Sequence, residues 1–385
     1  MAKGDIIKHQ RREFRDEATG ARVTRLTSGP DCKTILYFHD RPVTRNGRII
    51  YLSDQTGSWQ VYSLSMDASE AVQLTEASDM PAFQATLGSG DRNLYYCSQS
   101  HISCTDIDTL EDSTIGELPD IANEGISVNC DETLLAVCGA TRNQDVPTDM
   151  MTRTMTRHKN VIQILPTDGS RSCPLIKADL WLGHVQFAPS DPSLLSFCSE
   201  GVMFLVSQRM WVADVVERKI WPMGVQADED SISHEVFSRC GKYMVYQGVR
   251  DMVDCEGPDG AWNSGKHFVG IISTDQTYHE KFYISPDRQN YGHYAPSNDP
   301  FTLVCDGEAH PDTISIVRCR TGVAEFTPIC RHNTDFWARM TNGGYVHPHP
   351  VFTPDDRYIL FNATLDGPSD IYMVESSMPS SWRPR

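Results

Sequence analysis

The segment Phe352-Thr353-Pro354-Asp355-Asp356-Arg357-Tyr358-Ile359-Leu360-Phe361 predicts a strand, a tight turn and a second strand. Apolar residues flank a cluster of turn-forming residues, which is the pattern of a β-hairpin. A third strand is expected at Asp370-Ile371-Tyr372-Met373-Val374. The same order of segments occurs earlier, at residues 44–53, 59–64 and 71–75. We therefore expect a repeated unit built from several short antiparallel strands.

The repeat returns along the whole chain in degenerate form. Besides the copies near residues 36 and 347, weaker copies begin near Ala82, Gly125, Gly183, Ser233 and Gly292. Repeats of about 40–50 residues with about four short strands each are typical of β-propellers. The copies predict an all-β, seven-bladed β-propeller that forms a single domain over residues 1–385.

By its sequence pattern the last copy is one strand short, because it ends near Val374 after three strands. The N-terminal segment Ala21–Thr27 is similar to the outer strand of the first copy, Ala71–Thr75. We expect the N-terminal segment to complete the last blade and to close the ring. Closure of this kind leaves no open sheet edge between the first and last blades.

Composition narrows the class of protein. The net charge of −17 argues against nucleic acid or an anionic membrane as a partner. Residues 1–25 lack the apolar run of a signal peptide, and no segment approaches the roughly 18 apolar residues of a membrane span. The 12 cysteines include no CxxC pair, which argues against a zinc knuckle or a redox motif. Free thiols of this kind are typical of a cytoplasmic protein, so we expect a cytoplasmic location.

Two loops are longer than tight turns, near residues 141–160 and 250–266. The first is basic and the second acidic. Long loops in compact folds are usually functional or disordered, and a lid over a binding site is one role that we expect for them. Their charged residues are Arg142, Arg153, Arg157 and His158 in the first loop and Asp251, Asp254, Glu256 and Asp259 in the second.

Four histidines share one position in the repeat. Each lies three residues before the residue that we align in the first strand of its copy: His184 before Phe187, His234 before Phe237, His293 before Pro296 and His349 before Phe352. Each is therefore expected to open the innermost strand of a blade, and these strands begin at one mouth of the central channel. The alternative is that they are isolated polar residues at strand starts.

A histidine pair in the last copy predicts a metal site. His347 and His349 are two residues apart, so both rings lie on the same face of an extended chain. His293, from the preceding copy, completes a three-histidine face. Imidazole is a ligand for manganese, zinc, iron and nickel, and three such ligands leave positions open for water or substrate.

Several sequence elements together carry a family resemblance. They are Met1-Ala2-Lys3-Gly4, Ala71-Val72-Gln73-Leu74-Thr75-Glu76, Trp181-Leu182-Gly183-His184, Arg209-Met210-Trp211, His234-Glu235 and His347-Pro348-His349-Pro350 followed by Thr353-Pro354-Asp355-Asp356. On these residues nearly the whole chain resembles the oligogalacturonate lyases. The resemblance implies a cytoplasmic seven-bladed propeller enzyme that cleaves short galacturonides by β-elimination with Mn²⁺.

The resemblance also implies roles for individual residues. The metal ligands would be His293, His347 and His349, the Brønsted base His234, and an assisting arginine Arg209. Three positions depart from the family pattern. Gly344 replaces a glutamine ligand of the metal, Ser199 replaces a histidine, and no histidine precedes Tyr37-Phe38.

The chemistry of elimination agrees with these residue types. A neutral histidine can accept the C5 proton of a uronate, and a divalent ion on the neighbouring carboxylate stabilises the charge that develops. Arg209 can hold a carboxylate at two points. Solvent or Tyr294 are candidates for the acid that protonates the leaving group. His184 is a candidate substrate contact or a structural residue of the channel, and Asp306 is either part of a plain turn or the residue that orients His293.

Two alternatives remain at this point. The departures at Gly344 and Ser199 suit a lyase that acts on a different acidic oligosaccharide. A non-catalytic, sugar-binding propeller is the alternative from another class, because one fold hosts many functions. A hydrolase is disfavoured because no paired carboxylates stand out at channel positions. The sequence leaves the oligomeric state open.

Overall fold

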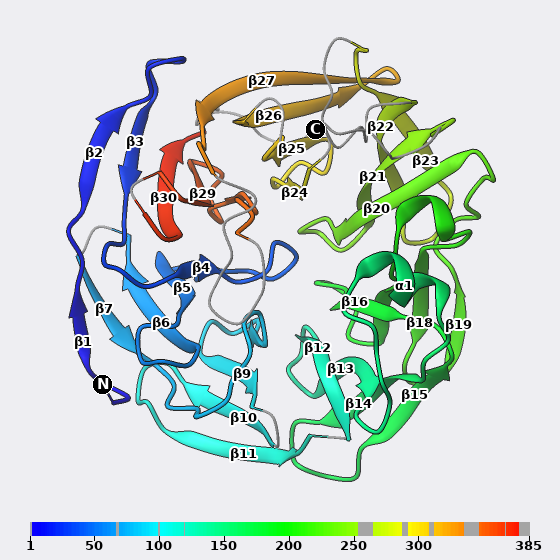
Figure 1. The fold of residues 1–385 in the computed structure, drawn as a ribbon, viewed down its shortest axis with the longest axis horizontal. Helices are drawn as coiled ribbons and strands as arrows, with labels where there is room; N and C mark the ends of the chain where they lie inside the picture. The colour runs from blue at the N-terminus through cyan, green and yellow to red at the C-terminus, as the bar shows by residue number, and fades with distance from the viewer. Residues whose placement is uncertain are drawn as a thin grey trace. The chain divides into compact units, whose positions relative to one another are not determined.

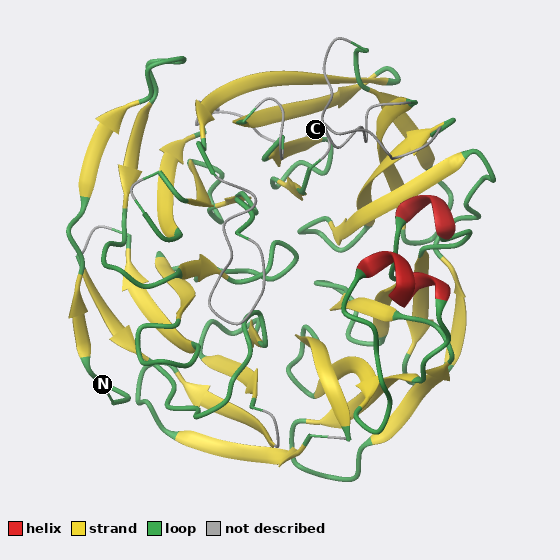
Figure 2. Ribbon diagram, in the orientation of Figure 1, coloured by secondary structure: helices red, strands yellow, loops and turns green. Residues whose placement is uncertain are grey.

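The computed structural model describes residues 2–66, 69–98, 101–118, 120–252, 265–286, 292–307, 312–334, 346–365 and 367–376. Strands dominate these ranges, and their two helices are α1 (Met150–Met155) and the 3-10 helix η1 (Met203–Leu205) (Figure 2). The prediction of an all-β chain is confirmed. The chain forms two compact units. Unit 1 comprises Met1–Ala82, His267–Ile271 and Glu280–Arg385, and unit 2 comprises Phe83–Lys266 and Ile272–His279.

Unit 1 contains three groups of paired strands (Figure 1). The first has the order β1 (Ile6–Lys8), β7 (Glu70–Gln73), β6 (Gln60–Ser65), β5 (Arg48–Ser53) and β4 (Lys33–Ile35). The second has the order β2 (Arg12–Arg15), β3 (Arg22–Arg25), β30 (Asp370–Glu375), β29 (Tyr358–Ala363) and β28 (Val351–Phe352). The third runs through β24 (Tyr294–Pro296), β25 (Thr302–Cys305), β26 (Thr313–Arg320) and β27 (Val323–Arg331).

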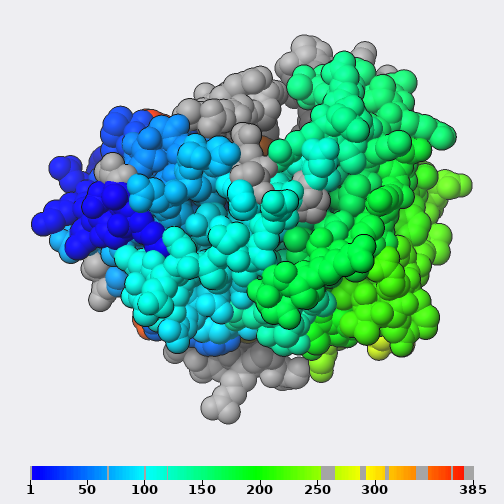
Figure 3. All heavy atoms as spheres, turned by 90° about the horizontal axis from the view of Figure 1, so that it is seen from below, coloured from blue at the N-terminus to red at the C-terminus, as the bar shows by residue number. Residues whose placement is uncertain are grey.

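The predicted N-terminal strand pairs with the last strand of the chain. β3 runs antiparallel to β30, with Val23 opposite Val374. A buried polar cluster at the start of β30 holds this pairing: the Thr27 hydroxyl donates to Asp370 at 2.8 Å, Arg25 forms an ion pair with the same carboxylate, and the Nζ of Lys33 lies 3.7 Å away. Most of the residues before this strand, dark blue in Figure 3, lie at the surface, whereas His9 and Asp16 are buried.

Unit 2 is built from antiparallel sheets of the same kind. Their strand orders are β11 (Asp112–Glu117), β10 (His101–Asp106), β9 (Asn93–Cys97), β8 (Ala85–Leu87); β12 (Ile121–Val128), β13 (Leu134–Thr141), β14 (Asn160–Pro166), β15 (Cys173–Ala178); and β16 (Leu182–Phe187), β17 (Leu194–Ser199), β18 (Met210–Asp214), β19 (Lys219–Pro222). β20 (Asp230–Phe237) pairs with β21 (Tyr243–Arg250). The boundary between the units falls within β22 (Lys266–Ser273) and β23 (His279–Tyr283).

The hairpin turns of the repeat share one hydrogen-bond scheme. In the turn between β28 and β29, the Thr353 hydroxyl accepts from the backbone N–H of Tyr358 at 3.1 Å and donates to Asp355 at 2.6 Å. Asp356 in the same turn has a φ of 57°, which Asp tolerates better than most residues. A hydroxyl accepts a backbone N–H in the same way at Thr44, Ser238 and Ser273. A Ser or Thr followed by turn residues therefore marks several of these turns.

Aromatic pairs occupy equivalent positions in the two clearest copies. Tyr51 lies opposite Tyr62 on the neighbouring strand, and Phe361 lies opposite Tyr372. The rings stack with centroids 5.3 and 5.7 Å apart, and all four side chains are buried in the core of unit 1. Such pairs contribute about 0.5–1.5 kcal/mol each beyond the burial of their area. The two copies therefore share core packing as well as turn structure.

Neither helix in the described part of the chain has the length and hydropathy that spanning a membrane requires.

Candidate functional site

The three histidines predicted as metal ligands lie together in unit 1. His293 immediately precedes β24, and His347 and His349 precede β28. One nitrogen from each ring lies within 4.8 Å of the others. The ring centroids are 4.3 Å apart for His293 and His349, 5.2 Å for His293 and His347, and 5.4 Å for His347 and His349. His293 and His349 are buried and His347 is half-buried. Three converging imidazoles are a donor set that suits a divalent transition metal.

Asp306 fixes the orientation of His293. One carboxylate oxygen accepts from the backbone N–H of His293 and the other contacts its Nδ1, both at 2.8 Å. Burial alone would raise the pKa of Asp306, but the facing His293 ring and its N–H keep that pKa below the ordinary value. An ionised carboxylate holds the hydrogen on Nδ1, so that Nε2 has the unprotonated form that metal binding requires. Of the two alternatives left open for Asp306, these contacts favour orientation of His293 over a plain turn.

Two aromatic rings cover the histidine cluster. Tyr37 and Phe38 follow β4, and their ring centroids lie 4.9 Å from His349 and 5.1 Å from His293. Phe38 is 2% exposed, whereas Tyr37 is half-buried. Apolar walls of this kind limit water around a metal site and strengthen electrostatic interactions there. The sequence drew attention to Tyr37-Phe38 only because no histidine precedes the pair.

In unit 2, the predicted histidine register corresponds to a distinct backbone conformation. His184 in β16 and His234 in β20 both sit where the strand register shifts, between Gly183 and Gln186 and between Ser233 and Val236. Their φ angles are 49° and 50°, and that of His349 in unit 1 is 43°. A left-handed backbone costs a non-glycine residue about 1–2 kcal/mol. Strain that recurs at one position of a repeat is typical of functional sites.

His184 belongs to a buried four-residue network, which we call the ion-pair quartet: His184, Glu200, Arg209 and Glu235. Arg209 contacts Glu200 through Nη1 at 3.0 Å and Nη2 at 3.1 Å, and Glu235 through Nε at 2.7 Å. His184 lies 2.9 Å from Glu235 and 3.3 Å from Glu200, through its two ring nitrogens. The His184 ring thus lies between the two carboxylates that Arg209 also contacts.

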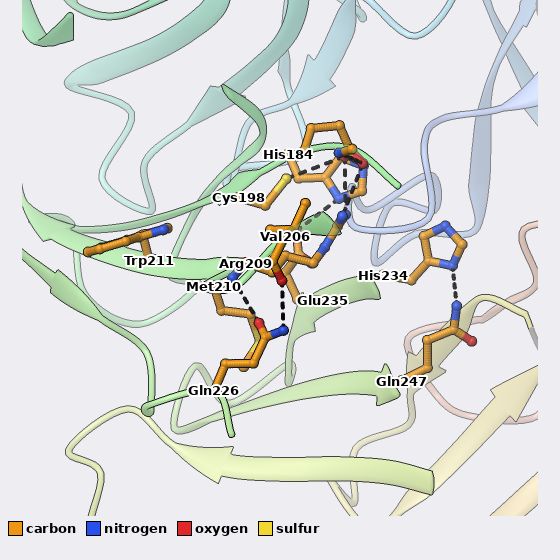
Figure 4. Close-up of polar contacts among 12 residues, drawn as sticks. His184, Cys198, Val206, Arg209, Met210, Trp211, Gln226, His234, Glu235 and Gln247 are labelled. Atoms are coloured by element: carbon orange, nitrogen blue, oxygen red, sulfur yellow. Dashed lines mark hydrogen bonds and ion pairs between the residues drawn. The ribbon is translucent and has the colours of Figure 1, made fainter. Parts of the chain in front are cut away.

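The quartet changes the interpretation of Arg209. Its side chain is 1% exposed, and its guanidinium already holds two carboxylates of the protein. Burial would raise the pKa of Glu200, but Arg209 and His184 outweigh that effect and hold it at about 2. Figure 4 shows Arg209 and Glu235 pointing toward His184, away from His234. The sequence suggested Arg209 and His184 as substrate contacts, but in this geometry both side chains are paired with carboxylates of the protein.

His234 stands apart from the quartet, as Figure 4 shows. Its ring is partly exposed and lies 6.5 Å from the His184 ring, nearly parallel to it. The side-chain amide of Gln247, from the paired strand β21, contacts Nδ1 at 2.8 Å. The contacting atom of this amide is its nitrogen, Nε2 of Gln247. Of the predicted residues in unit 2, His234 is thus the one that lies outside the quartet.

The bulge that carries His234 is held by β16. The amide of Gln186 donates to the backbone carbonyl of Glu235 at 2.8 Å and accepts from the N–H of Phe237 at 3.3 Å. Together with the Arg209–Glu235 bond, these contacts hold the chain on either side of His234. The strained φ of His234 is therefore supported by buried hydrogen bonds.

Two other candidates from the sequence do not belong to an accessible site. Tyr294 is 0% exposed, and burial raises the pKa of its hydroxyl well above the ordinary value. A side chain wholly inside the core does not reach a ligand, so the structure argues against Tyr294 both as the acid for the leaving group and as a substrate contact. Gly344 and most of the loop at 250–266 lie outside the described residues.

A second cluster of potential ligand atoms, His184, Cys198 and Glu200, fits a metal poorly. Burial raises the pKa of the Cys198 thiol well above its ordinary value, so the thiol stays protonated at neutral pH. Glu200 is already paired with Arg209, whose charge repels a cation. The histidine cluster of unit 1 is the better metal site.

Sequence reasoning assigned no role to Glu200, Glu235, Gln186 or Gln247. The two glutamates could have been noticed from their neighbours in the sequence, because Glu235 follows His234 and Glu200 lies two residues after Cys198. The glutamines had none, because they lie on strands whose pairing brings them to His234.

Comparisons with known proteins agree on one family. A family model described as oligogalacturonate lyase matches residues 1–253. The oligogalacturonate lyase of Dickeya dadantii (strain 3937) is 25% identical over 404 aligned positions, which cover 97% of this chain and 98% of the relative. A solved oligogalacturonate lyase in complex with manganese is 25% identical, covers 99% of both chains and has a TM-score of 0.86. The oligogalacturonate lyase of Vibrio parahaemolyticus, at 22% identity and covering 99% of this chain and all of its own, has the same fold with a TM-score of 0.85.

Proposed function

Because this chain belongs to the oligogalacturonate lyase family, we propose that it cleaves short oligogalacturonides by β-elimination with the help of Mn²⁺. Its relatives are lyases, and one solved relative is a complex with manganese. The observation that carries the proposal is the three-histidine cluster backed by Asp306.

The residues of this cluster fit a divalent ion. His293, His347 and His349 would hold it, and Asp306 keeps the ligand atom of His293 free of hydrogen. When bound, the ion supplies a Lewis acid for the galacturonate carboxylate, which makes the adjacent C5–H more acidic. Tyr37 and Phe38 exclude water from the cluster and hold the rings in place.

His234 is the residue that we assign as the base. It accepts the C5 proton at Nε2, the C4–O4 bond breaks as the double bond between C4 and C5 forms, and the departing O4 takes a proton from solvent. For Nε2 to accept, Nδ1 must carry the hydrogen, so the Gln247 amide would present its oxygen to Nδ1. The two ends of an amide differ only by a half-turn of the group, and this orientation is part of the proposal.

We assign Arg209 and His184 to positioning rather than to substrate contact. Arg209 holds Glu235, the residue next to His234, and His184 joins Glu235 to Glu200. A buried network of ion pairs resists movement, because removing one partner leaves another charge uncompensated. Under this proposal, loss of Arg209 lowers turnover through displacement of His234.

We further infer that the sheets are the blades of one seven-bladed propeller, with β3 completing the last blade. The pairing of β3 with β30 and the similarity to a solved lyase support this inference. All of the described cysteines are free thiols, which supports a cytoplasmic location. A crystal structure would test the architecture, and cell fractionation would test the location.

The experiment that tests the function mixes the protein with Mn²⁺ and trigalacturonate and follows the ultraviolet absorbance of the unsaturated product. His234→Ala should abolish turnover and retain the metal, whereas His349→Ala should lose both. His101→Ala, an exposed histidine on β10, serves as the control and should change neither. Substantial turnover by His234→Ala would remove the base from the proposal.

A further inference from the structure

The long basic loop of unit 2 contains an arginine with unmet hydrogen-bond capacity. Arg153 lies in α1, and its guanidinium stacks on the ring of Trp181 with the central carbon 3.8 Å from the ring centroid. Its Nη2 contacts Glu124 at 2.5 Å, and the same carboxylate accepts from the Trp181 indole N–H at 2.9 Å. The guanidinium is thus fixed in place on two sides.

A guanidinium has five N–H donors. In Arg153, only the Nη2 contact with Glu124 has an acceptor within the described part of the chain, and the buried Nε has none there. Arg209, in the same unit, uses its fork for Glu200 and its Nε for Glu235. Arg209 therefore binds two carboxylates and Arg153 binds one. Arg153 therefore keeps guanidinium donors that a second carboxylate could accept from.

Arg153 adjoins the part of unit 2 that carries the base. Glu124 lies at the register shift of β12, the position that His184 and His234 occupy in β16 and β20. Trp181 directly precedes β16, and Figure 1 shows α1 beside that strand. The hydroxyl of Thr154, the residue after Arg153, accepts from the backbone N–H of Val202 at 3.0 Å. This contact joins α1 to the loop that follows Glu200.

The charge of this loop suits an anionic ligand. Residues 142–159 contain four Lys or Arg and two Asp, a net charge of +2 in a chain whose total is −17. A polyanion such as an oligogalacturonide is repelled by the chain as a whole and needs a local positive region. Arginine matches carboxylates better than lysine because its planar fork makes two parallel hydrogen bonds.

We propose that Arg153, held by Trp181 and Glu124, binds the carboxylate of a galacturonate residue next to the one that is cleaved. This inference rests on the proposed function for the identity of the ligand. It assigns to the loop at 141–160 the selection of oligomers over single sugars, since a second uronate must be present to reach Arg153.

The test measures binding without turnover, by titrating trigalacturonate into the His234→Ala protein in a calorimeter. Arg153→Ala added to this background should weaken binding about tenfold or more, the usual range for a lost hydrogen bond to a charged group. Arg153→Lys should give an intermediate loss. Arg157→Ala, an exposed arginine of the same loop with the same change of charge, should shift the dissociation constant by less than about twofold.

Equal dissociation constants for Arg153→Ala and Arg157→Ala would overturn the inference, as would the absence of any binding by the His234→Ala protein. Should Arg153→Ala fail to fold, unchanged affinity in Arg153→Lys would overturn it instead. Trigalacturonate should also alter the tryptophan fluorescence, and Trp181→Phe should remove that change. If the wild-type protein makes no unsaturated product, the proposed function fails, yet the calorimetry still decides the role of Arg153.

Discussion

Substitution of Asp306 by asparagine probes the metal site through a single hydrogen atom. The Asp306 carboxylate accepts the backbone N–H of His293 with one oxygen and contacts Nδ1 of the same residue with the other. A backbone N–H can only donate, so the asparagine oxygen must face it. The asparagine NH₂ group then faces Nδ1. Two donors cannot bond each other, so the hydrogen of the ring must move to Nε2, where it blocks the ligand atom.

The expected magnitude follows from this geometry. Asp306 is 0% exposed, so no water compensates for the change. To bind the metal, His293 must keep its hydrogen on Nδ1, where it would face the NH₂ group of the asparagine. The hydrogen bond that Nδ1 makes to the charged Asp306 carboxylate is then lost, which costs about 1.5–3 kcal/mol. Loss of such supporting partners weakens metal affinity about 10–100-fold, or about 1.4–2.8 kcal/mol. The two estimates agree, and we expect the dissociation constant for Mn²⁺ to rise within that range.

The assay titrates metal-free protein with Mn²⁺ and measures the free ion by electron paramagnetic resonance. Asp299→Asn, in the turn between β24 and β25, makes the same change of charge away from the histidines and is the matched control. Thermal unfolding should show that both variants fold. A dissociation constant for Asp306→Asn within about twofold of the control would refute the tautomer argument.

Three further predictions concern positioning and stability. Gln186→Leu should lower kcat about tenfold or more by releasing the bulge at His234, with the shape of the pH–rate profile retained; the same effect in the control Gln163→Leu would contradict this reasoning. Burial would raise the pKa of Glu200, but Arg209 and His184 hold it at about 2, below the ordinary 4.5. The ionised Glu200 therefore stabilises the folded protein fully above about pH 4.5, and this stabilisation is lost as the pH falls toward 2. Urea unfolding at several pH values should show that Glu200→Gln loses less stability in acid than the wild-type protein does. Asp370→Asn should cost about 3–5 kcal/mol in urea unfolding because two cations lose their buried partner, whereas the exposed Glu375→Gln should change little.

Much of the fold could be predicted because its signals are local. The Thr-Pro-Asp-Asp stretch at 353–356 forms a turn through bonds between residues no more than five apart, and the apolar run Ile359–Phe361 that follows is buried in the core. Pairing of the N-terminal strand with β30 could be inferred from its similarity to Ala71–Thr75. The buried cluster around Asp370 that holds this pairing could not, because it joins residues some 340 positions apart.

The candidate site divides along the same line. The spacing of His347 and His349 brings both rings to one face, and the repeat brings His293 beside them. The repeat also placed His184 and His234 in one register, although it gave no reason for the left-handed backbone that they share. Their partners are set by which strands lie next to each other.

By itself, the sequence determined the strand repeat, the position of each histidine within the repeat and the three imidazoles of the histidine cluster, since these follow from spacing along the chain. Only the tertiary structure decided which charges meet. It buried Tyr294, enclosed Arg209 between Glu200 and Glu235, and left Arg153 with one carboxylate. The physical reason is that an ionic bond depends on separations of a few ångströms in space, and residues that are distant in sequence reach those separations only through packing.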